Sequence, residues 1–238
     1  MGQARLEHAH ELKRRGDVHL ASAGWLSARE LYQDARALFA ETEDAEGQAQ
    51  CLRGLGDVAL KLKESAEAER YYEECLRLCQ SQGSAVAAAE VIERLGDLHR
   101  LAERWDQARL RLDEASRAYE HAGHTQGVAR CHGLLGEVER MAGADAAVVL
   151  DHYQAARDLQ LASGDLRGAA VTLGFLANFL KDLGQHTRAA EVYAQTAELY
   201  DGLGLQHRAA PFRAAARRLD PTLDLPDTAA PKAAWDED

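Results

Sequence analysis

The feature that most constrains this sequence is a glycine followed by an acidic residue, a pair that returns every 40 residues. The pairs are Gly16-Asp17, Gly56-Asp57, Gly96-Asp97 and Gly136-Glu137. A fixed interval of this length is typical of repeat proteins, in which each unit buries its apolar face against the next unit. We therefore expect an array of similar units rather than one globular core.

An alanine and a large side chain recur in phase with these glycines. The positions are Ala28 and Tyr32, Ala68 and Tyr72, Ala108 and Leu112, Val149 and Tyr153, and Ala189 and Tyr193. One residue is added after Met141, so the last two sets are shifted by one position. Small alanines allow two helices to approach closely. We expect the tyrosines to fill the space between neighbouring units rather than to bind a ligand.

Each unit is predicted to contain two amphipathic helices. In the second unit, apolar residues recur three or four positions apart, which places them on one helical face. These residues are Cys51, Leu55, Val58 and Leu62. Glycines in the turns are expected to end helices in the left-handed conformation, and polar residues after them to cap the next helix. The expected pairs are Gly83 with Ser84, Gly123 with Thr125, and Gly164 with Asp165, and Gly204 ends the last repeat.

These patterns predict an all-α fold of five helix-turn-helix repeats and a C-terminal capping helix. The repeats span about residues 4–41, 44–81, 84–122, 125–163 and 165–202, and the capping helix spans 206–219. Residues 220–238 contain six acidic residues and a single lysine, so we expect them to form an acidic, flexible tail.

Charge and composition narrow the classes of partner. The net charge is −11 and there is no basic cluster, which argues against binding to nucleic acid through phosphates. No apolar run is long enough to span a membrane, and the N-terminus lacks the apolar stretch of a secretory signal. The four cysteines do not form the dense framework of secreted domains, so a cytoplasmic location is expected.

The repeat pattern resembles the tetratricopeptide repeat. The resemblance rests on Leu55-Gly56, Ala68 and Tyr72 and on Leu95-Gly96, Ala108, Leu112 and Ala115, with Trp25 and Trp105 three residues before the alanine. The long period is similar to that of kinesin light chains and of bacterial regulators with tetratricopeptide arrays. The resemblance implies a right-handed α-solenoid whose first helices line a concave groove, where partners bind as peptides or helices.

Carrying the groove positions of that family onto this sequence gives a set of candidate binding residues. They are Lys13, Asp17, Gln50, Arg53, Asp57, Glu93, Asp97, Arg100, Arg130, Gly133, Glu137, Arg140, Gly174, Asn178 and Lys181. The acids among them have two interpretations: a ladder that prefers a basic or amide-rich segment, or charges neutralised locally, as by Lys61 four residues after Asp57. Gly133 and Gly174 likewise provide an open groove floor or allow close helix packing.

The tail contains one conspicuous group, Trp235 followed by Asp236 and Glu237. A tryptophan beside acids resembles the short cargo peptides that kinesin light chains accept. One hypothesis is that this group occupies a groove, its own or that of a neighbouring copy, and competes with the partner. The alternative is a solvated tail.

Motifs for catalysis, nucleotide binding or metal binding are not found in the sequence. His121, His124, Cys131 and His132 lie near one turn, a spacing that chance produces in a helical chain with ten histidines. Cys75 and Cys79 are interpreted as small buried apolar residues. We therefore predict no enzyme activity, no cofactor and no metal.

The sequence thus predicts a cytoplasmic, non-catalytic scaffold or adaptor that binds a partner peptide or helix in a concave groove. The alternative is a regulatory sensor that binds a signalling peptide or small ligand and acts through another protein. The partner's identity stays open, and self-association through the end helices is possible.

Overall fold

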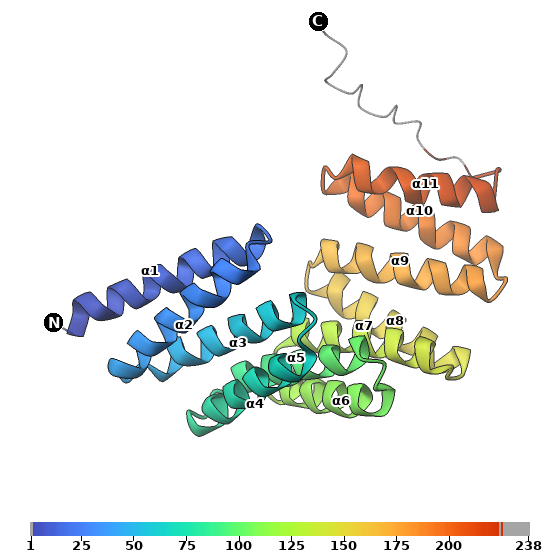
Figure 1. Cartoon of the computed structure of the whole chain (residues 1–238). Helices are drawn as coiled ribbons and strands as arrows, with labels where there is room; N and C mark the ends of the chain where they lie inside the picture. Colours follow the sequence, from blue (N-terminus) through green and yellow to red (C-terminus); the bar gives the residue numbers. More distant parts are fainter. Residues whose placement is uncertain (1, 224, 226–238) are drawn as a thin grey trace, which may run out of the picture. The chain divides into compact units, whose positions relative to one another are not determined.

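The computed structural model describes residues 2–223 and 225, which form eleven α-helices and no strand. The helices are α1 (Gly2–Ala21), α2 (Trp25–Glu41), α3 (Ala45–Lys61), α4 (Ser65–Ser81), α5 (Ala85–Leu101), α6 (Trp105–His121), α7 (Thr125–Ala142), α8 (Ala146–Ala162), α9 (Leu166–Asp182), α10 (His186–Gly202) and α11 (Gln206–Leu219) (Figure 1). The predicted all-α class is confirmed, with ten helices in five successive pairs and an eleventh after them.

The helices divide between two compact units. Unit 1 is Met1–Gly127 and unit 2 is Val128–Asp238. In unit 1, consecutive helices from α1 to α6 pack on one another, and α1 also contacts α3. In unit 2, α8, α9, α10 and α11 form the same kind of chain of contacts. The last helix packs on α10, in the position that the first helix of a further repeat would take.

The turns between helices use the left-handed backbone conformation that the sequence predicted. Gly83, Gly123, Gly164 and Gly204 have φ angles of 68°, 66°, 75° and 72°. The predicted caps are only partly found. Asp165 accepts a hydrogen bond from the amide of Gly168, but Ser84 makes no such bond. Thr125 was wrongly assigned, because α7 begins at that residue and His124 before it accepts from the amide of Gly127.

The 40-residue period has a packing cause, which is the contact between each glycine and a tyrosine or leucine. A Cβ atom at Gly16 would lie 2.9 Å from the ring of Tyr32, and one at Gly54 would lie 2.6 Å from the same ring. A Cβ atom at Gly56 would overlap the ring of Tyr72. Tyr32 is therefore wedged between α1 and α3, as the sequence predicted for the tyrosines.

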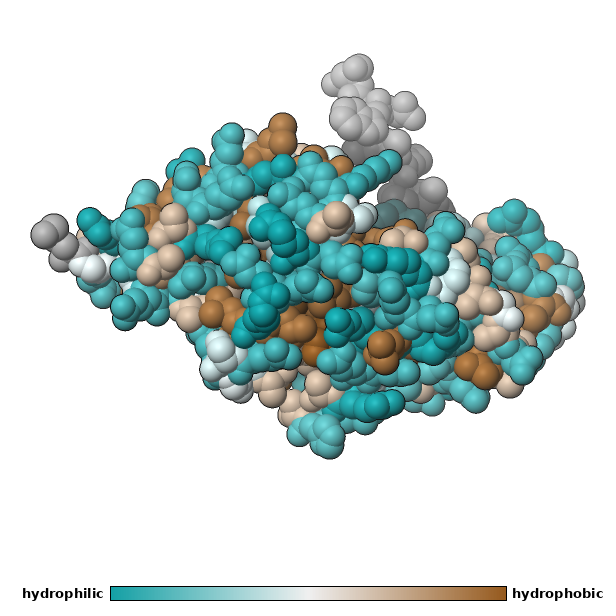
Figure 2. All heavy atoms as spheres, turned by 60° about the horizontal axis from the view of Figure 1, so that its bottom comes forward, coloured by the Kyte–Doolittle hydropathy of each residue, from teal (hydrophilic) through white to brown (hydrophobic). Residues whose placement is uncertain are grey.

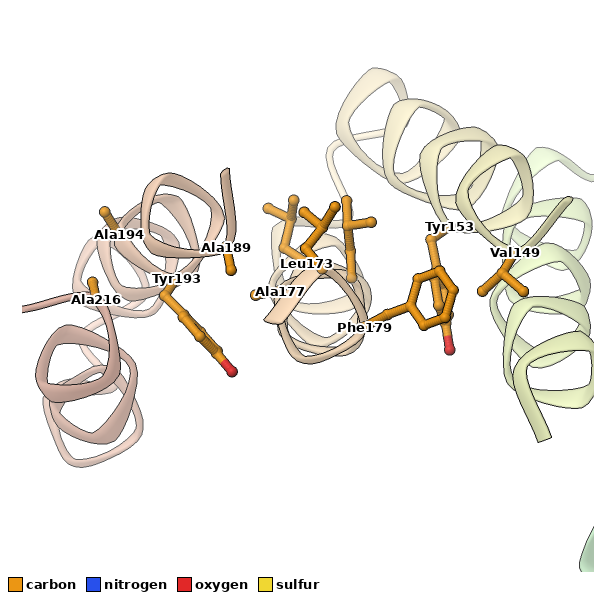
Figure 3. Packing of buried hydrophobic residues seen from close by; sticks show 11 residues of the cluster. Val149, Tyr153, Leu173, Ala177, Phe179, Ala189, Tyr193, Ala194 and Ala216 are labelled. Carbon is orange, nitrogen blue, oxygen red and sulfur yellow. The ribbon is translucent and has the colours of Figure 1, made fainter. Parts of the chain in front are cut away.

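The core of unit 2 shows the same arrangement of small and large residues. Ala177 and Ala189 are fully buried where α9 and α10 meet, and Tyr193 extends from α10 into the space between α9 and α11 (Figure 3). Tyr153 extends from α8 and packs against Phe179 of α9, with ring centroids 6.4 Å apart. The alanines thus set the close approach of helices, and the aromatic rings fill the space between pairs.

Hydrophilic residues dominate the molecular surface in the view of Figure 2, where hydrophobic residues form small groups. None of the helices in the described part of the chain combines the length and the apolar character that crossing a membrane requires.

Candidate partner-binding site

The acid of the repeated glycine-acid pair accepts a hydrogen bond from the buried tyrosine of the same repeat. The hydroxyl of Tyr32 donates to Asp17 Oδ1 at 2.8 Å, and that of Tyr72 donates to Asp57 Oδ1 at 2.6 Å. We call this contact the tyrosine clamp. Burial, together with the hydrogen bond and the charge of the acceptor, raises the pKa of both tyrosines well above the usual value.

The fifth repeat has the same clamp with a neutral acceptor. The hydroxyl of Tyr193 donates to Asn178 Oδ1 at 2.6 Å. The third repeat has Leu112 in place of the tyrosine, and there Tyr119 donates to Glu93 Oε2 at 2.7 Å. Four of the predicted groove residues therefore accept a hydrogen bond from a tyrosine hydroxyl: Asp17, Asp57, Glu93 and Asn178.

The aspartates of the glycine-acid pairs in unit 1 form ion pairs with nearby cations. Lys13 Nζ lies 3.0 Å from Asp17 Oδ2, and Arg100 Nη2 lies 2.7 Å from Asp97 Oδ1. The suggested partner of Asp57, Lys61, was wrong: the cation beside that carboxylate is Arg94 of the next repeat, 3.7 Å away. These contacts favour local neutralisation over a free acidic ladder in unit 1.

A pocket of about 330 Å³ lies between α3, α4 and α5 of unit 1. Gln50 and Arg53, both predicted groove residues, line one wall, and Glu90 lines the opposite wall. Arg53 Nη1 lies 2.5 Å from Glu90 Oε2, so an ion pair joins the two first helices across the pocket. Gln50 donates to Glu46 on its own helix at 3.2 Å.

Cys75 and Cys79 form the inner side of this pocket and are buried, as the sequence predicted. The thiol of Cys75 contacts the carbonyl oxygen of Ala49 at 3.1 Å. The side-chain interaction between Cys75 and Cys79 lowers the pKa of Cys79 to about 7 and raises that of Cys75. This polar coupling was missed, because the apolar spacing of the two residues concealed it.

A second pocket, of about 380 Å³, lies between α9, α10 and α11 of unit 2. Two predicted residues, Asn178 and Lys181, line it beside Tyr193. The remaining lining residues all come from α11 and were not predicted. They are Pro211, Phe212, Ala215, Arg218 and Leu219. The sequence identified α11 as a cap, but gave no sign that its inner face would form a wall.

The two mid-helix glycines have different surroundings. An added Cβ atom at Gly133 would meet Thr172 Oγ1 at 3.9 Å and nothing nearer. At Gly174 it would lie 3.2 Å from the ring of Phe212. Close packing therefore explains Gly174, whereas α7 has open space at Gly133.

The other predicted residues lie on the expected first helices or beyond the described chain. Arg130, Glu137 and Arg140 are on α7, with Arg130 exposed and the other two half-buried. Trp235, Asp236 and Glu237 lie outside the described residues. Among the described histidines, cysteines and acids, no group of three or more could hold a metal ion.

Comparison with solved structures finds proteins with the same fold and low sequence identity. The apo form of RapI is 14% identical, with a TM-score of 0.66 over 90% of this chain and 84% of that chain. Aspartyl phosphate phosphatase F from Bacillus subtilis is 11% identical, with a TM-score of 0.67 over 92% of this chain. The Rap conjugation gene regulator of plasmid pLS20, solved with a Phr peptide, is 14% identical, with a TM-score of 0.63 over 91% of this chain. This chain spans 61% and 63% of the lengths of the last two proteins.

Comparison with curated proteins finds no match. The family model that matches is the tetratricopeptide repeat, over residues 4–81. The helical pairs after residue 81 continue the same arrangement, and the solved structures share the fold. Residues 4–81 therefore match the tetratricopeptide repeat family, and the described chain as a whole shares the helical-repeat fold of the solved structures.

Proposed function

We propose that this chain is a non-catalytic adaptor that binds a partner peptide or helix on the first-helix faces of its repeats. The observation that carries the proposal is the position of the two pockets. Each lies between consecutive first helices, α3 and α5 in unit 1 and α9 and α11 in unit 2, and each presents charged side chains above a buried base. Convergent polar groups above apolar surface are typical of binding sites.

The size of the pockets supports a segment of protein as the ligand. Volumes of about 330 and 380 Å³ are at the small end of the range for ligand sites. Each pocket suits a side-chain anchor of a longer segment. A peptide that lies along first helices would use several such anchors, which is the way helices and peptides are recognised in grooves.

Within unit 2, the open space at Gly133 makes α7 a further first helix with room for a partner. A floor without a side chain allows the backbone or a bulky side chain of the partner to approach the helix. The glycine costs about 1 kcal/mol of helix stability relative to alanine. Because no packed neighbour needs the space at this position, partner approach is the reason we propose for its presence.

A regulatory sensor is the second candidate. It is favoured by one structural relative, the Rap conjugation gene regulator, which was solved in complex with a Phr peptide. A sensor would change its affinity for a second protein when the peptide binds, whereas a simple adaptor would not. Pull-down of a second protein with and without peptide distinguishes the two.

The absence of catalysis is also part of the proposal, and it is testable because one structural relative is named as an aspartyl phosphate phosphatase. We expect no release of phosphate when the full chain is incubated with an aspartyl-phosphorylated protein. Accelerated release would contradict the non-catalytic assignment.

The test of the binding face is a selection of random displayed peptides on the immobilised full chain. We expect peptides that bind the wild type to lose at least tenfold in affinity for Gly133→Trp, since the new side chain fills the floor of α7. Val148→Trp, at an exposed position on α8, is the matched control and should keep the affinity. Equal binding by both variants would exclude α7 as part of the binding face.

A further inference from the structure

The pocket of unit 2 differs from the rest of the repeat array in charge. Its lining contains two cations, Lys181 and Arg218, and no carboxylate. Among the described residues, Lys181 pairs with Asp182 at 3.9 Å, the weak end of an ion pair, and Arg218 donates a hydrogen bond to the carbonyl oxygen of Ala214. Both cations are therefore available to an acidic ligand.

The position that carries an acid in the earlier repeats is an amide here. Asn178 occupies the place of Asp17, Asp57 and Asp97 and accepts the tyrosine hydroxyl through its oxygen. Because the oxygen is used, the side-chain NH₂ group of Asn178 is left to donate. This exchange removes a negative charge from the pocket and supplies a donor to a carboxylate or a peptide carbonyl.

Below the polar rim, the pocket is lined by aromatic and apolar side chains. The ring of Phe212 lies 6.1 Å from the ring of Tyr193 and 5.7 Å from that of Tyr200. Pro211 and Leu219 complete the apolar lining. The chemistry that fits is an aromatic side chain followed by carboxylates.

The segment of this chain after residue 225 has that chemistry. Trp235 is followed by Asp236, Glu237 and Asp238. No other tryptophan in the sequence is followed by three acids, since Trp25 precedes a leucine and Trp105 precedes a single aspartate.

The path of the chain brings this segment close to the pocket. Arg217 Nη2 donates to the carbonyl oxygen of Leu225 at 2.8 Å, and Leu225 packs against the core of unit 2. The segment therefore starts beside α11, which forms one wall of the pocket. Ten Cα–Cα steps lead from Leu225 to Trp235 and can span about 33 Å. The fourteen residues of α11 are about 21 Å long, so every part of that wall is within reach.

We propose that Trp235–Asp238 binds in this pocket of the same chain, with the indole against Phe212 and Tyr193 and the acids beside Lys181 and Arg218. The docking itself does not depend on the proposed function. Competition between the docked segment and a partner does rest on the proposed function. A linker of this length gives an effective concentration on the order of 1 mM. A segment that binds with a Kd of about 100 μM would then lower the affinity for a competing partner about tenfold.

The test uses Trp235 as the only tryptophan in the full chain, in the background Trp25→Phe/Trp105→Phe. We expect its fluorescence to be quenched by acrylamide several-fold less than that of a synthetic peptide of residues 226–238. Lys181→Glu/Arg218→Glu should restore full quenching. Arg188→Glu/Arg208→Glu carries the same charge change at exposed positions outside the pocket and should leave the protection intact.

Three results would overturn the docking. One is quenching equal to that of the peptide in the single-tryptophan chain without charge substitutions, and another is equal protection in both charge variants. The third is protection that disappears on dilution, which would assign the contact to a second copy. Peptide selection distinguishes the docking of the tail from the proposed function. If Trp235 is protected and no peptide is selected, the docking stands and the adaptor function is contradicted. If peptides are selected and Trp235 is exposed, the adaptor function stands and the docking is contradicted. If both hold, Trp235→Ala should raise the affinity for selected peptides that lose binding to Lys181→Glu.

Discussion

The same tyrosine clamp is built with a carboxylate in unit 1 and with an amide in unit 2. Tyr72 donates to Asp57 and Tyr193 donates to Asn178, and both contacts are 2.6 Å long. The comparison teaches that packing of the repeat requires an acceptor oxygen at this position but not a charge. Unit 1 uses the charge to pair with cations of neighbouring positions, such as Arg94. The fifth repeat, in unit 2, has Asn178 instead, which leaves a cationic pocket there.

The two units also differ in the turns that join their helices. Four turns of unit 1 place a residue other than glycine in the left-handed conformation: Ala23, Glu43, Lys63 and Glu103. The turns of unit 2 have glycine at this position: Gly143, Gly164, Gly184 and Gly204. A side chain with a Cβ atom costs roughly 1–2 kcal/mol in this conformation. Unit 1 therefore carries backbone strain that unit 2 avoids.

The largest effect is expected where a glycine lies under a tyrosine. Gly56→Ala in unit 1 should lower the free energy of unfolding by about 2–3 kcal/mol, because the new methyl group overlaps the ring of Tyr72. Urea unfolding followed by circular dichroism measures it. Substitutions at positions with free space usually change stability by less than about 0.5 kcal/mol. A loss that small would contradict the close contact between Gly56 and the ring of Tyr72.

Alkaline pH should test the two tyrosine clamps of unit 1. An unfolded tyrosine loses its proton near pH 10, whereas Tyr32 and Tyr72 keep theirs because their pKa values in the folded state are raised. Stability is therefore unaffected below pH 10 and falls above it, by about 1.4 kcal/mol per pH unit for each tyrosine. Absorbance at 295 nm and helicity should change together. Tyr32→Phe/Tyr72→Phe should reduce the slope, and an unchanged slope would exclude these clamps as its source.

Removing the hydroxyl should cost more in unit 1 than in unit 2. Hydrogen bonds to a charged acceptor contribute about 1.5–3 kcal/mol and neutral ones about 0.5–1.5 kcal/mol. We therefore expect Tyr72→Phe to destabilise the protein more than Tyr193→Phe, as measured by thermal unfolding. The opposite order would mean that the charge of Asp57 adds nothing to the clamp.

The turns allow reciprocal substitutions. Lys63→Gly should raise the free energy of unfolding by about 1 kcal/mol, and Gly184→Ala should lower it by about the same amount. Chemical denaturation of both variants measures the pair. If Lys63→Gly destabilises the chain, the lysine side chain makes contacts that outweigh the backbone strain.

The smallest effect is expected at the open floor of α7. Gly133→Ala should stabilise the chain by up to about 1 kcal/mol through helix propensity alone. Gly174→Ala should gain less, because its methyl group would press on Phe212 at 3.2 Å. Equal gains in thermal unfolding would remove the distinction between an open and a packed glycine.

The sequence predicted the helices well because local signals agreed with one another. Glycine, alanine and tyrosine recur in phase, and the turn glycines have the expected φ angles. The roles of the acids stayed open, because the spacing between Asp57 and Tyr72 does not reveal that their side chains meet. Arg94 was missed as a partner since it lies 37 residues further along the chain. Only one wall of the pocket of unit 2 was predicted, through Asn178 and Lys181. The other wall is formed by the inner face of α11, which the sequence did not identify as a binding surface.

The claim that partners bind the first-helix faces is tested most directly by photo-crosslinking. A peptide selected on the full chain would carry a benzophenone side chain, and mass spectrometry would identify the residues that it labels. We expect crosslinks on first helices, at the pocket of α9 and α11, at Gly133 of α7, or at the pocket of α3 and α5. Crosslinks confined to the second helices, such as α8 and α10, would contradict it.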